Sequence, residues 1–192
     1  MAYNPVVHNR HSIRLQGYDY SQSGAYFITI CTYKKERFFG EIVNGEMKLN
    51  LLGNYAYHQW KQISSRFDNL ELDEFVIMPN HVHGIIVIQS DKVEESENNN
   101  HFPREKLYSN PSIVQPHRQI HQNGTVPGSI GAIIQNYKSV TTRKINAMPA
   151  MKNTKIWQVN YYDHIIRDEA DHARIIEYIR ENPAKWEQDE LF

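Results

Sequence analysis

Four consecutive β-branched residues, Ile85 to Ile88, close an apolar segment that begins at His81. A strand places successive side chains on opposite faces of a sheet, so an unbroken apolar run needs apolar cover on both faces. Pro79 and Asn80, directly before the segment, are turn-forming residues. The run therefore predicts a central strand that is entered from a tight turn, in a sheet covered by helices at least partly on each side.

Two histidines stand at the mouth of this strand, His81 and His83, with one apolar residue between them. Alternate residues of a strand share a face, so the two imidazoles are expected side by side, with Cα atoms roughly 6.6 Å apart. The pair offers two nitrogens to a divalent metal. A strand histidine is more often a hydrogen-bonded part of the core, and two ligands do not complete a site. A third ligand would have to come from elsewhere in the chain.

Length and composition favour one globular domain over residues 1–192. The chain is 40% hydrophobic and 22% charged, which suits a protein with a proper core. Its 21 Lys and Arg against 22 Asp and Glu give a formal net charge of −1. This balance excludes a bulk electrostatic DNA binder, so any contact with nucleic acid must be local.

Cysteine usage and hydropathy bear on the compartment. Cys31 is the single cysteine, so no disulfide can form within the chain. Residues 1–16 are too polar for a signal peptide, and no apolar run approaches the roughly 20 residues of a membrane span. We expect a cytoplasmic protein without a membrane segment.

The remaining patterns predict an alternation of strands and helices. In order, they are an irregular lead-in over 10–24, a strand over 25–33, a hairpin over 38–49 around Asn44-Gly45, a helix over 50–67 capped by Asn50, a strand over 72–78, a helix from near Ser129, a short strand and its approaches within 156–166, and a helix over 169–181. This order predicts an α+β protein with a ferredoxin-like βαββαβ antiparallel sheet.

Residues 89–127 differ in composition from the rest of the chain. They are polar, contain several Asn and Pro residues and show no apolar period, which is typical of a flexible insertion. The segment contains His101, His117 and His121, and we do not expect these histidines to bind metal.

The last predicted helix turns three isoleucines toward the sheet, and Tyr178 lies on the flank of that face. Arg174, four residues before, and Asn182, four residues after, share this flank. A phenol, a guanidinium and an amide would then look into the same cleft. A helical tyrosine beside isoleucines is ordinarily core, and Asn182 before Pro183 is an ordinary helix end. The pattern alone leaves both interpretations open.

Two blocks of the sequence, Pro79 to Gly84 and Glu177 to Pro183, resemble the REP-associated branch of the single-tyrosine HUH transposases. The similarity extends over most of the chain outside residues 89–127. It includes Ser12–Leu15, Gly17–Tyr20, Gly24–Phe27, Phe39–Glu41, Lys138-Ser139, Trp157-Gln158 and Tyr162–Arg167.

The resemblance implies roles for residues of both blocks. His81 and His83 would be the metal-binding HUH pair, Tyr178 the nucleophile and Mg²⁺ or Mn²⁺ the cofactor. Asn182 occupies a position that often holds a Gln ligand in the wider superfamily. Because asparagine is shorter than glutamine, the resemblance does not decide whether Asn182 coordinates the metal directly.

The implied activity is metal-dependent cleavage and strand transfer of single-stranded or hairpin DNA through a 5′-phosphotyrosine intermediate. Arg174 faces the cleft and is the first candidate for a phosphate contact. Other candidates for DNA contacts are Lys34, Lys35, Arg37, Lys138, Arg143 and Lys144. Two alternatives are a nuclease that activates water and a DNA-binding module that does not cut. A monomer and a homodimer are both compatible with the sequence.

Overall fold

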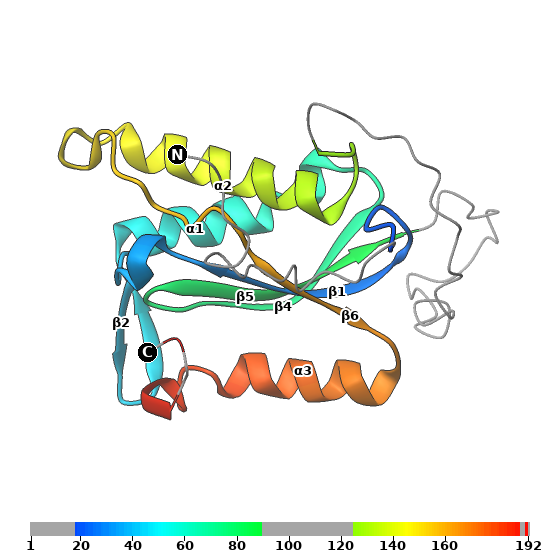
Figure 1. Cartoon of the computed structure of the whole chain (residues 1–192). Coiled ribbons are helices and arrows are strands. Elements are labelled where there is room, and N and C mark those ends of the chain that lie inside the picture. The colour runs from blue at the N-terminus through cyan, green and yellow to red at the C-terminus, as the bar shows by residue number, and fades with distance from the viewer. Residues whose placement is uncertain (1–17, 90–124, 189–190, 192) are drawn as a thin grey trace, which may run out of the picture.

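The computed structural model describes residues 18–89, 125–188 and 191 (Figure 1). Most of the predicted insertion over 89–127, including its three histidines, lies outside these ranges, and so does the first part of the lead-in over 10–24. The prediction of a single domain over 1–192 therefore stays a prediction. None of the helices in the described ranges has the length and apolar character needed to cross a membrane.

One antiparallel sheet of four strands, in the order β4-β5-β1-β6, forms the centre of the molecule (Figure 1). Its members are β1 (Gly24–Cys31), β4 (Leu70–Ile77), β5 (His81–Ile88) and β6 (Tyr162–Ile166). A helix connects β1 to β4 and another connects β5 to β6, while β4 and β5 are joined by a turn. This is the predicted ferredoxin-like βαββαβ fold, which is confirmed.

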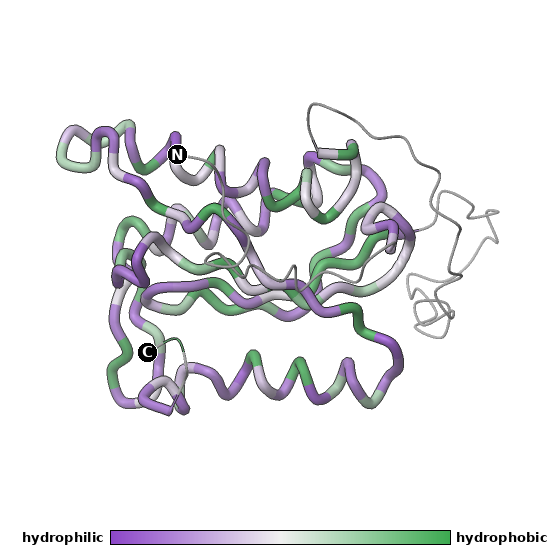
Figure 2. The backbone as a smooth tube through the Cα atoms, viewed as in Figure 1, coloured by the Kyte–Doolittle hydropathy of each residue, from purple (hydrophilic) through white to green (hydrophobic). Residues whose placement is uncertain are grey.

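Helices cover both faces of the sheet, as the apolar run predicted (Figure 1). Helices α1 (Leu51–Lys61) and α2 (Ile130–Asn146) lie on one face, and α3 (Glu169–Glu181) lies on the other. Strand β5 is buried along its whole length. Along α3, hydrophobic and hydrophilic segments alternate, as expected for a helix buried on one side (Figure 2).

The sheet separates two hydrophobic clusters. The larger one packs β-strand residues such as Ile86 against α1 and α2, with Trp60 and Tyr137 fully buried in it. The smaller one joins Ile85 to Ile175 and Ile179 of α3. Alternation along β5 sends odd-numbered side chains toward α3 and even-numbered ones toward α1 and α2. The two motif histidines therefore face the nucleophile-bearing helix predicted from the sequence.

Packing against α1 explains why residue 84, which follows the histidine pair, is a glycine. Its position faces α1, and a Cβ atom there would lie 2.3 Å from Cζ2 of Trp60 and 2.9 Å from Cβ of Phe75. Both distances are shorter than real Cβ contacts allow. The strand therefore needs glycine at this point so that the indole can pack directly against its backbone.

The helix N-termini carry side-chain caps. Oδ1 of Asn50 accepts a hydrogen bond from the backbone N–H of Gly53 at 2.9 Å, which confirms the predicted cap of α1. Ser129 caps α2, and Oδ1 of Asp168 accepts from the N–H of Asp171 at 2.8 Å at the start of α3. The predicted bounds of α3 are also confirmed.

The predicted helix over 50–67 is too long. Helix α1 ends at Lys61, and a separate 3₁₀ turn, η2, covers Ser64–Arg66. Ser64 and Ser65 favour such an end because their hydroxyls compete for backbone hydrogen bonds, and Oγ of Ser65 donates to the carbonyl of Gln62. Ile63 is fully buried at the break. Its apolar side chain therefore extended the apolar pattern of the sequence beyond the residue at which the helix ends.

One predicted strand is shorter than expected, and another agrees with its prediction. The strand over 25–33 ends at Cys31 and is followed by a 3₁₀ turn, η1 (Tyr33–Lys35), in which Lys34 and Lys35 have positive φ angles of 55° and 58°. The short strand predicted within 156–166 is confirmed as β6, which covers the last five residues. Before it, residues 158–160 form a loop whose carbonyls bond to a lysine side chain described below.

The predicted hairpin is confirmed as a separate two-stranded sheet, β2 (Gly40–Val43) and β3 (Glu46–Leu49). Asn44 and Gly45 form its turn with φ angles of 53° and 76°, as in a type I′ turn. A Cβ atom at Gly45 would lie 3.5 Å from Cα of Ala184. The turn of the hairpin therefore lies against the segment that follows α3.

Candidate active site

His81 and His83 lie side by side beneath α3, as the strand pattern predicted. Their side chains are buried, with exposed fractions of 0% and 2%, and their ring centroids are 4.4 Å apart. They extend from the start of β5, directly after the turn that contains Asn80. The sequence thus predicted both their common face and their proximity.

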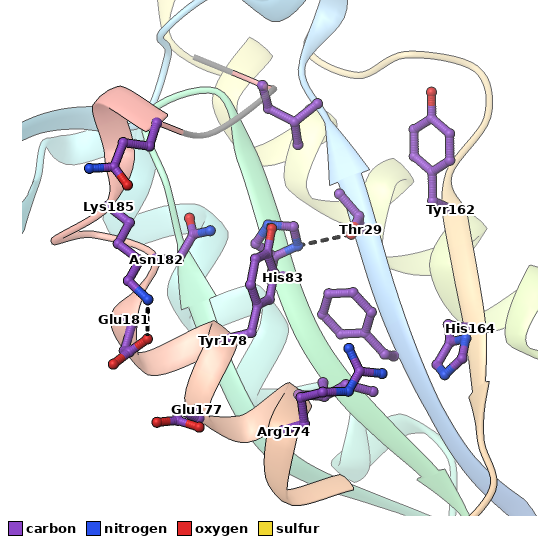
Figure 3. A pocket seen from close by; sticks show the side chains of 14 residues that line it. Thr29, His83, Tyr162, His164, Arg174, Glu177, Tyr178, Glu181, Asn182 and Lys185 are labelled. Atoms are coloured by element: carbon purple, nitrogen blue, oxygen red, sulfur yellow. Dashed lines mark hydrogen bonds and ion pairs between the residues drawn. The ribbon is translucent and has the colours of Figure 1, made fainter. Parts of the chain in front are cut away.

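His83 has a hydrogen-bond partner on each ring nitrogen. Nδ1 lies 2.8 Å from the hydroxyl oxygen of Thr29, the cross-strand neighbour of His83 on β1 (Figure 3). Nε2 lies 3.2 Å from the hydroxyl oxygen of Tyr178 on α3. A neutral imidazole has one donor and one acceptor nitrogen. When Nδ1–H donates to Thr29, the lone pair of Nε2 is directed at Tyr178.

The orientation of His81 is set by its neighbour in the turn. Nδ1 of His81 lies 2.7 Å from Oδ1 of Asn80, and Nδ2 of Asn80 donates to the carbonyl of Leu191 at 2.6 Å. The second bond fixes which end of the amide faces the histidine. Because Oδ1 can only accept, Nδ1 of His81 carries the proton and Nε2 keeps the lone pair.

Electrostatics keep His83 uncharged. Burial lowers the pKa of the His83 imidazole well below its ordinary value, and repulsion from His81 lowers it further. His83 is therefore neutral at pH 7 and keeps a lone pair for a proton or a metal.

Tyr178 projects from α3 into a pocket of about 950 Å³ (Figure 3). Its side chain is 45% exposed, and its ring meets that of Phe27 edge-on, with centroids 6.0 Å apart. Arg174, His83 and Asn182 line the same pocket. Asn182 is 3% exposed and lies at the C-terminal end of α3. The structure thus gathers the phenol, the guanidinium and the amide that the helical spacing had placed on one flank.

A metal at this site would have two nitrogen ligands and an oxygen ligand. Within the described ranges, no three His, Cys, Asp or Glu side chains come together as a metal site. His81 lies beside His83, with ring centroids 4.4 Å apart, and His83 and Asn182 line the same pocket. Metal-binding histidines commonly hydrogen-bond through their second nitrogen, and both imidazoles here use Nδ1 in this way. The donor set therefore fits a divalent ion held by two Nε2 atoms and an amide oxygen.

Arg174, the first candidate for a DNA contact, pairs with an acidic side chain at the pocket. Arg174 is exposed, lines the pocket and pairs with Asp171, which also accepts a hydrogen bond from Nε2 of His164 at 2.7 Å. Burial alone would raise the pKa of the Asp171 carboxyl, but the hydrogen bonds and charges of His164 and Arg174 outweigh it and lower that pKa. Asp171 is therefore an anion that restrains the guanidinium at the pocket.

Lys138 points to a loop. Its Nζ atom donates to the carbonyls of Gln158, Val159 and Asn160 at 2.9, 3.3 and 2.8 Å. Burial lowers the pKa of this ammonium group to about 8. A DNA contact by Lys138, predicted from the sequence, would compete with these three bonds.

The other basic candidates are not among the residues that line the pocket of Tyr178. Lys34 and Lys35 follow β1, and Arg37 lies over the ring of Trp186 at 5.6 Å from its centroid. Arg143 and Lys144 lie in the last turn of α2, on the opposite face of the sheet from α3. Their roles in DNA binding stay predictions.

Sequence reasoning missed the residues that orient the predicted ones. Thr29 was visible as a polar residue within an apolar strand, but its pairing with His83 depends on the strand register. His164 and Asp171 gave no signal of a site. The helix itself is tied to β4 by a 2.7 Å hydrogen bond between Nε2 of His172 and Oδ2 of Asp73. This contact helps to fix where α3 lies.

A sequence relative covers nearly the whole chain. An uncharacterized protein of Haemophilus influenzae is 44% identical over 193 residues, which cover 99% of this chain and 97% of that protein. The chain belongs to the same family as this protein. No model of a known protein family matches the sequence.

A solved structure shares the fold of this chain. A REP-associated tyrosine transposase, solved bound to a REP hairpin, aligns with a TM-score of 0.56 at 16% sequence identity. The alignment covers 92% of this chain and 74% of the transposase. The resemblance read from the sequence is therefore confirmed at the level of the fold.

Proposed function

We propose that this protein cleaves and rejoins single-stranded DNA in a transposase-like reaction in which Tyr178 is the nucleophile. The observation that carries the proposal is the 3.2 Å contact between the Tyr178 hydroxyl and Nε2 of His83, inside a pocket that also contains Asn182. His83 of β5 lines this pocket together with the phenol and the amide, and His81 lies beside His83. The fold shared with a transposase that was solved bound to a REP hairpin supports DNA as the substrate.

The chain's own groups would prepare the phenol for attack. At neutral pH a free phenol, with a pKa of about 10, is almost fully protonated, so its proton must leave during the reaction. Before a metal is bound, neutral His83 accepts the hydrogen bond of the Tyr178 hydroxyl, and the bond to Thr29 keeps the ring of His83 fixed. Arg174 is positioned to contact a phosphate of the bound strand.

His81, His83 and Asn182 would hold Mg²⁺ or Mn²⁺, and imidazole ligands favour Mn²⁺. A bound divalent ion would polarise the scissile phosphate and offset its negative charge. In the structure the Tyr178 hydroxyl lies at the same nitrogen of His83 that would bind the ion. The phenol therefore has to move off this nitrogen when the site is loaded.

The strand-transfer step balances without an external energy source. A bond forms between the Tyr178 oxygen and the phosphorus, the bond from that phosphorus to the 3′ oxygen breaks, and the 3′ oxygen leaves as a hydroxyl after taking up a proton. The product is a 5′-phosphotyrosine ester, which keeps the energy of the broken bond. Attack by a 3′-hydroxyl on this ester reverses the step and releases Tyr178.

The proposal is tested by incubating the protein with labelled hairpin DNA that carries single-stranded flanks, in the presence of Mn²⁺, and separating the products on a denaturing gel. We expect a covalent protein–DNA adduct that Tyr178→Phe abolishes. The matched control is Tyr57→Phe, which removes the same atom from a tyrosine of α1 on the opposite face of the sheet.

Each other outcome identifies a different function. Cleaved DNA without an adduct would indicate a nuclease that uses water, and bound but intact DNA would indicate a DNA-binding module. Mass spectrometry of the adduct peptide locates the attachment, and an adduct on Tyr161 or Tyr162 would exclude Tyr178 as the nucleophile.

A further inference from the structure

Tyr162 is an exposed aromatic residue on the wall of the pocket opposite α3. It is 48% exposed, lies at the start of β6 and lines the same pocket as Tyr178. Figure 3 shows Tyr162 and His164 on the β6 side of this pocket, across from the acidic and basic side chains of α3. The pocket therefore has an aromatic wall and a charged wall.

The strand register gives the distance of this wall from the histidines. Tyr162 is the cross-strand partner of Thr29, and Thr29 is the cross-strand partner of His83. Adjacent strands lie about 4.8 Å apart, so Tyr162 and His83 are separated by two spacings, or roughly 10 Å, on the same face. A strand whose phosphate lies at Tyr178 can place a neighbouring base against this wall.

The backbone that leads into Tyr162 is held in place from the other side. The ammonium group of Lys138 binds three successive carbonyls, those of residues 158–160. Only Tyr161 separates this loop from Tyr162, so the start of β6 is fixed before any ligand arrives. An aromatic ring on a fixed backbone loses little freedom when a flat ligand stacks on it.

Charge decides what kind of group fits each wall. Glu177 and Glu181 line the α3 side, and Glu181 pairs with Lys185. Arg174, also on the α3 side, suits a phosphate, whereas the β6 side offers the rings of Tyr162 and His164. An uncharged, planar base is therefore the part of a nucleotide that suits the β6 side, and stacking on aromatic rings is how single-stranded DNA is commonly held.

The geometry points to Tyr162 as a stacking platform for a base next to the reacting phosphate of single-stranded DNA. The inference rests on the proposed function, because it takes the pocket at Tyr178 to be the site that binds the strand. Every base has an aromatic face, so the contact selects single-stranded over paired DNA without selecting a sequence.

Affinity for fluorescein-labelled oligothymidine, measured by fluorescence anisotropy in EDTA so that no cutting occurs, tests the platform. Tyr162→Ser should weaken binding by about 5- to 100-fold, the usual effect of losing one stacked base. Tyr162→Phe keeps the ring and should stay within about twofold of the wild type. Val159→Ser, at a 79% exposed position of the adjoining loop that does not line the pocket, is the matched surface control.

A second measurement uses the unmodified protein and so does not depend on whether a variant folds. Irradiation of a 5-iodouracil-substituted oligothymidine bound to the protein should crosslink the strand to the peptide that contains Tyr162. Equal affinities of Tyr162→Ser and Tyr162→Phe would overturn the inference, and so would a crosslink confined to other peptides.

The adduct assay separates this inference from the proposed function. An adduct on Tyr178 together with binding that is indifferent to the Tyr162 ring overturns the platform alone. Ring-dependent binding without any adduct overturns the cleavage reaction alone.

Discussion

The hydroxyl oxygen of Thr29 lies 2.8 Å from Nδ1 of His83, across the pairing of β1 with β5. The remaining nitrogen of the imidazole faces Tyr178. A threonine on a neighbouring strand thus sets the orientation of the histidine that meets Tyr178.

Thr29→Val removes this hydroxyl while keeping the shape of the side chain. We expect Mn²⁺ affinity to fall by about 10- to 100-fold, as is typical when the partner of a metal-binding histidine is lost. Isothermal titration with Mn²⁺ measures the effect, and Thr29→Ser, which retains a hydroxyl, should bind nearly as the wild type does. Equal affinity of the valine and serine variants would contradict the role given to Thr29.

Arg174→Gln should weaken binding of single-stranded DNA and make it less sensitive to salt. Removing one phosphate contact lowers the slope of log affinity against log salt concentration by about one. The matched control is Arg180→Gln on the same helix, because Arg180 pairs with Glu74 of β4 and does not line the pocket of Tyr178. If both variants show the same slope as the wild type, Arg174 does not contact phosphate.

The Lys138 ammonium should titrate near pH 8, because burial lowers its pKa to about that value. NMR of lysine labelled at Cε should separate it from exposed lysines, which titrate near pH 10.4. Between about pH 8 and 10.5 the unfolded chain holds the proton that the folded chain has released, so this group's contribution to stability rises with pH across that window.

Lys138→Met provides the check on that sign. The free energy of unfolding of the wild type minus that of Lys138→Met, from urea titrations, should be larger near pH 9.5 than near pH 7.5. A difference that falls with pH would show that the three carbonyls hold the proton more strongly than burial expels it.

Gly84→Ala should destabilise the fold, because the new methyl group would overlap Trp60 and Phe75. Overpacking of this kind costs about 1–3 kcal/mol, which urea unfolding can measure. Trp60→Phe makes room beside the strand, so the double variant should lose less than the sum of the single variants. Strict additivity would mean that the indole is not what excludes a side chain at residue 84.

The sequence predicted those parts of the site that depend on local periodicity. The common face of His81 and His83 follows from the two-residue period of a strand, and the positions of Tyr178 and Asn182 follow from the helical period. The apolar run from Ile85 to Ile88 likewise predicted cover on both faces. These are short-range geometric facts, and the structure agrees with them.

The remaining parts depend on contacts between distant segments. Which residue of β1 lies opposite His83 is decided by register, and a shift of one residue would have turned Thr29 to the other face. The three carbonyls that bind Lys138 become acceptors only because the chain forms a loop before β6, which packs near α2 in a way that no local pattern reveals. The end of α1 was misplaced because buried Ile63 continued the apolar pattern beyond the helix.

The partition of the interior by the sheet has an evolutionary consequence. Among the described residues, the buried cluster that contacts α1 and α2 has no member in common with the buried cluster that holds α3 against the sheet. Changes on one side are therefore nearly additive with changes on the other. Related chains can therefore change residues between the sheet and α1 and α2 without altering the geometry around the histidines. The two layers of such a protein can evolve at different rates.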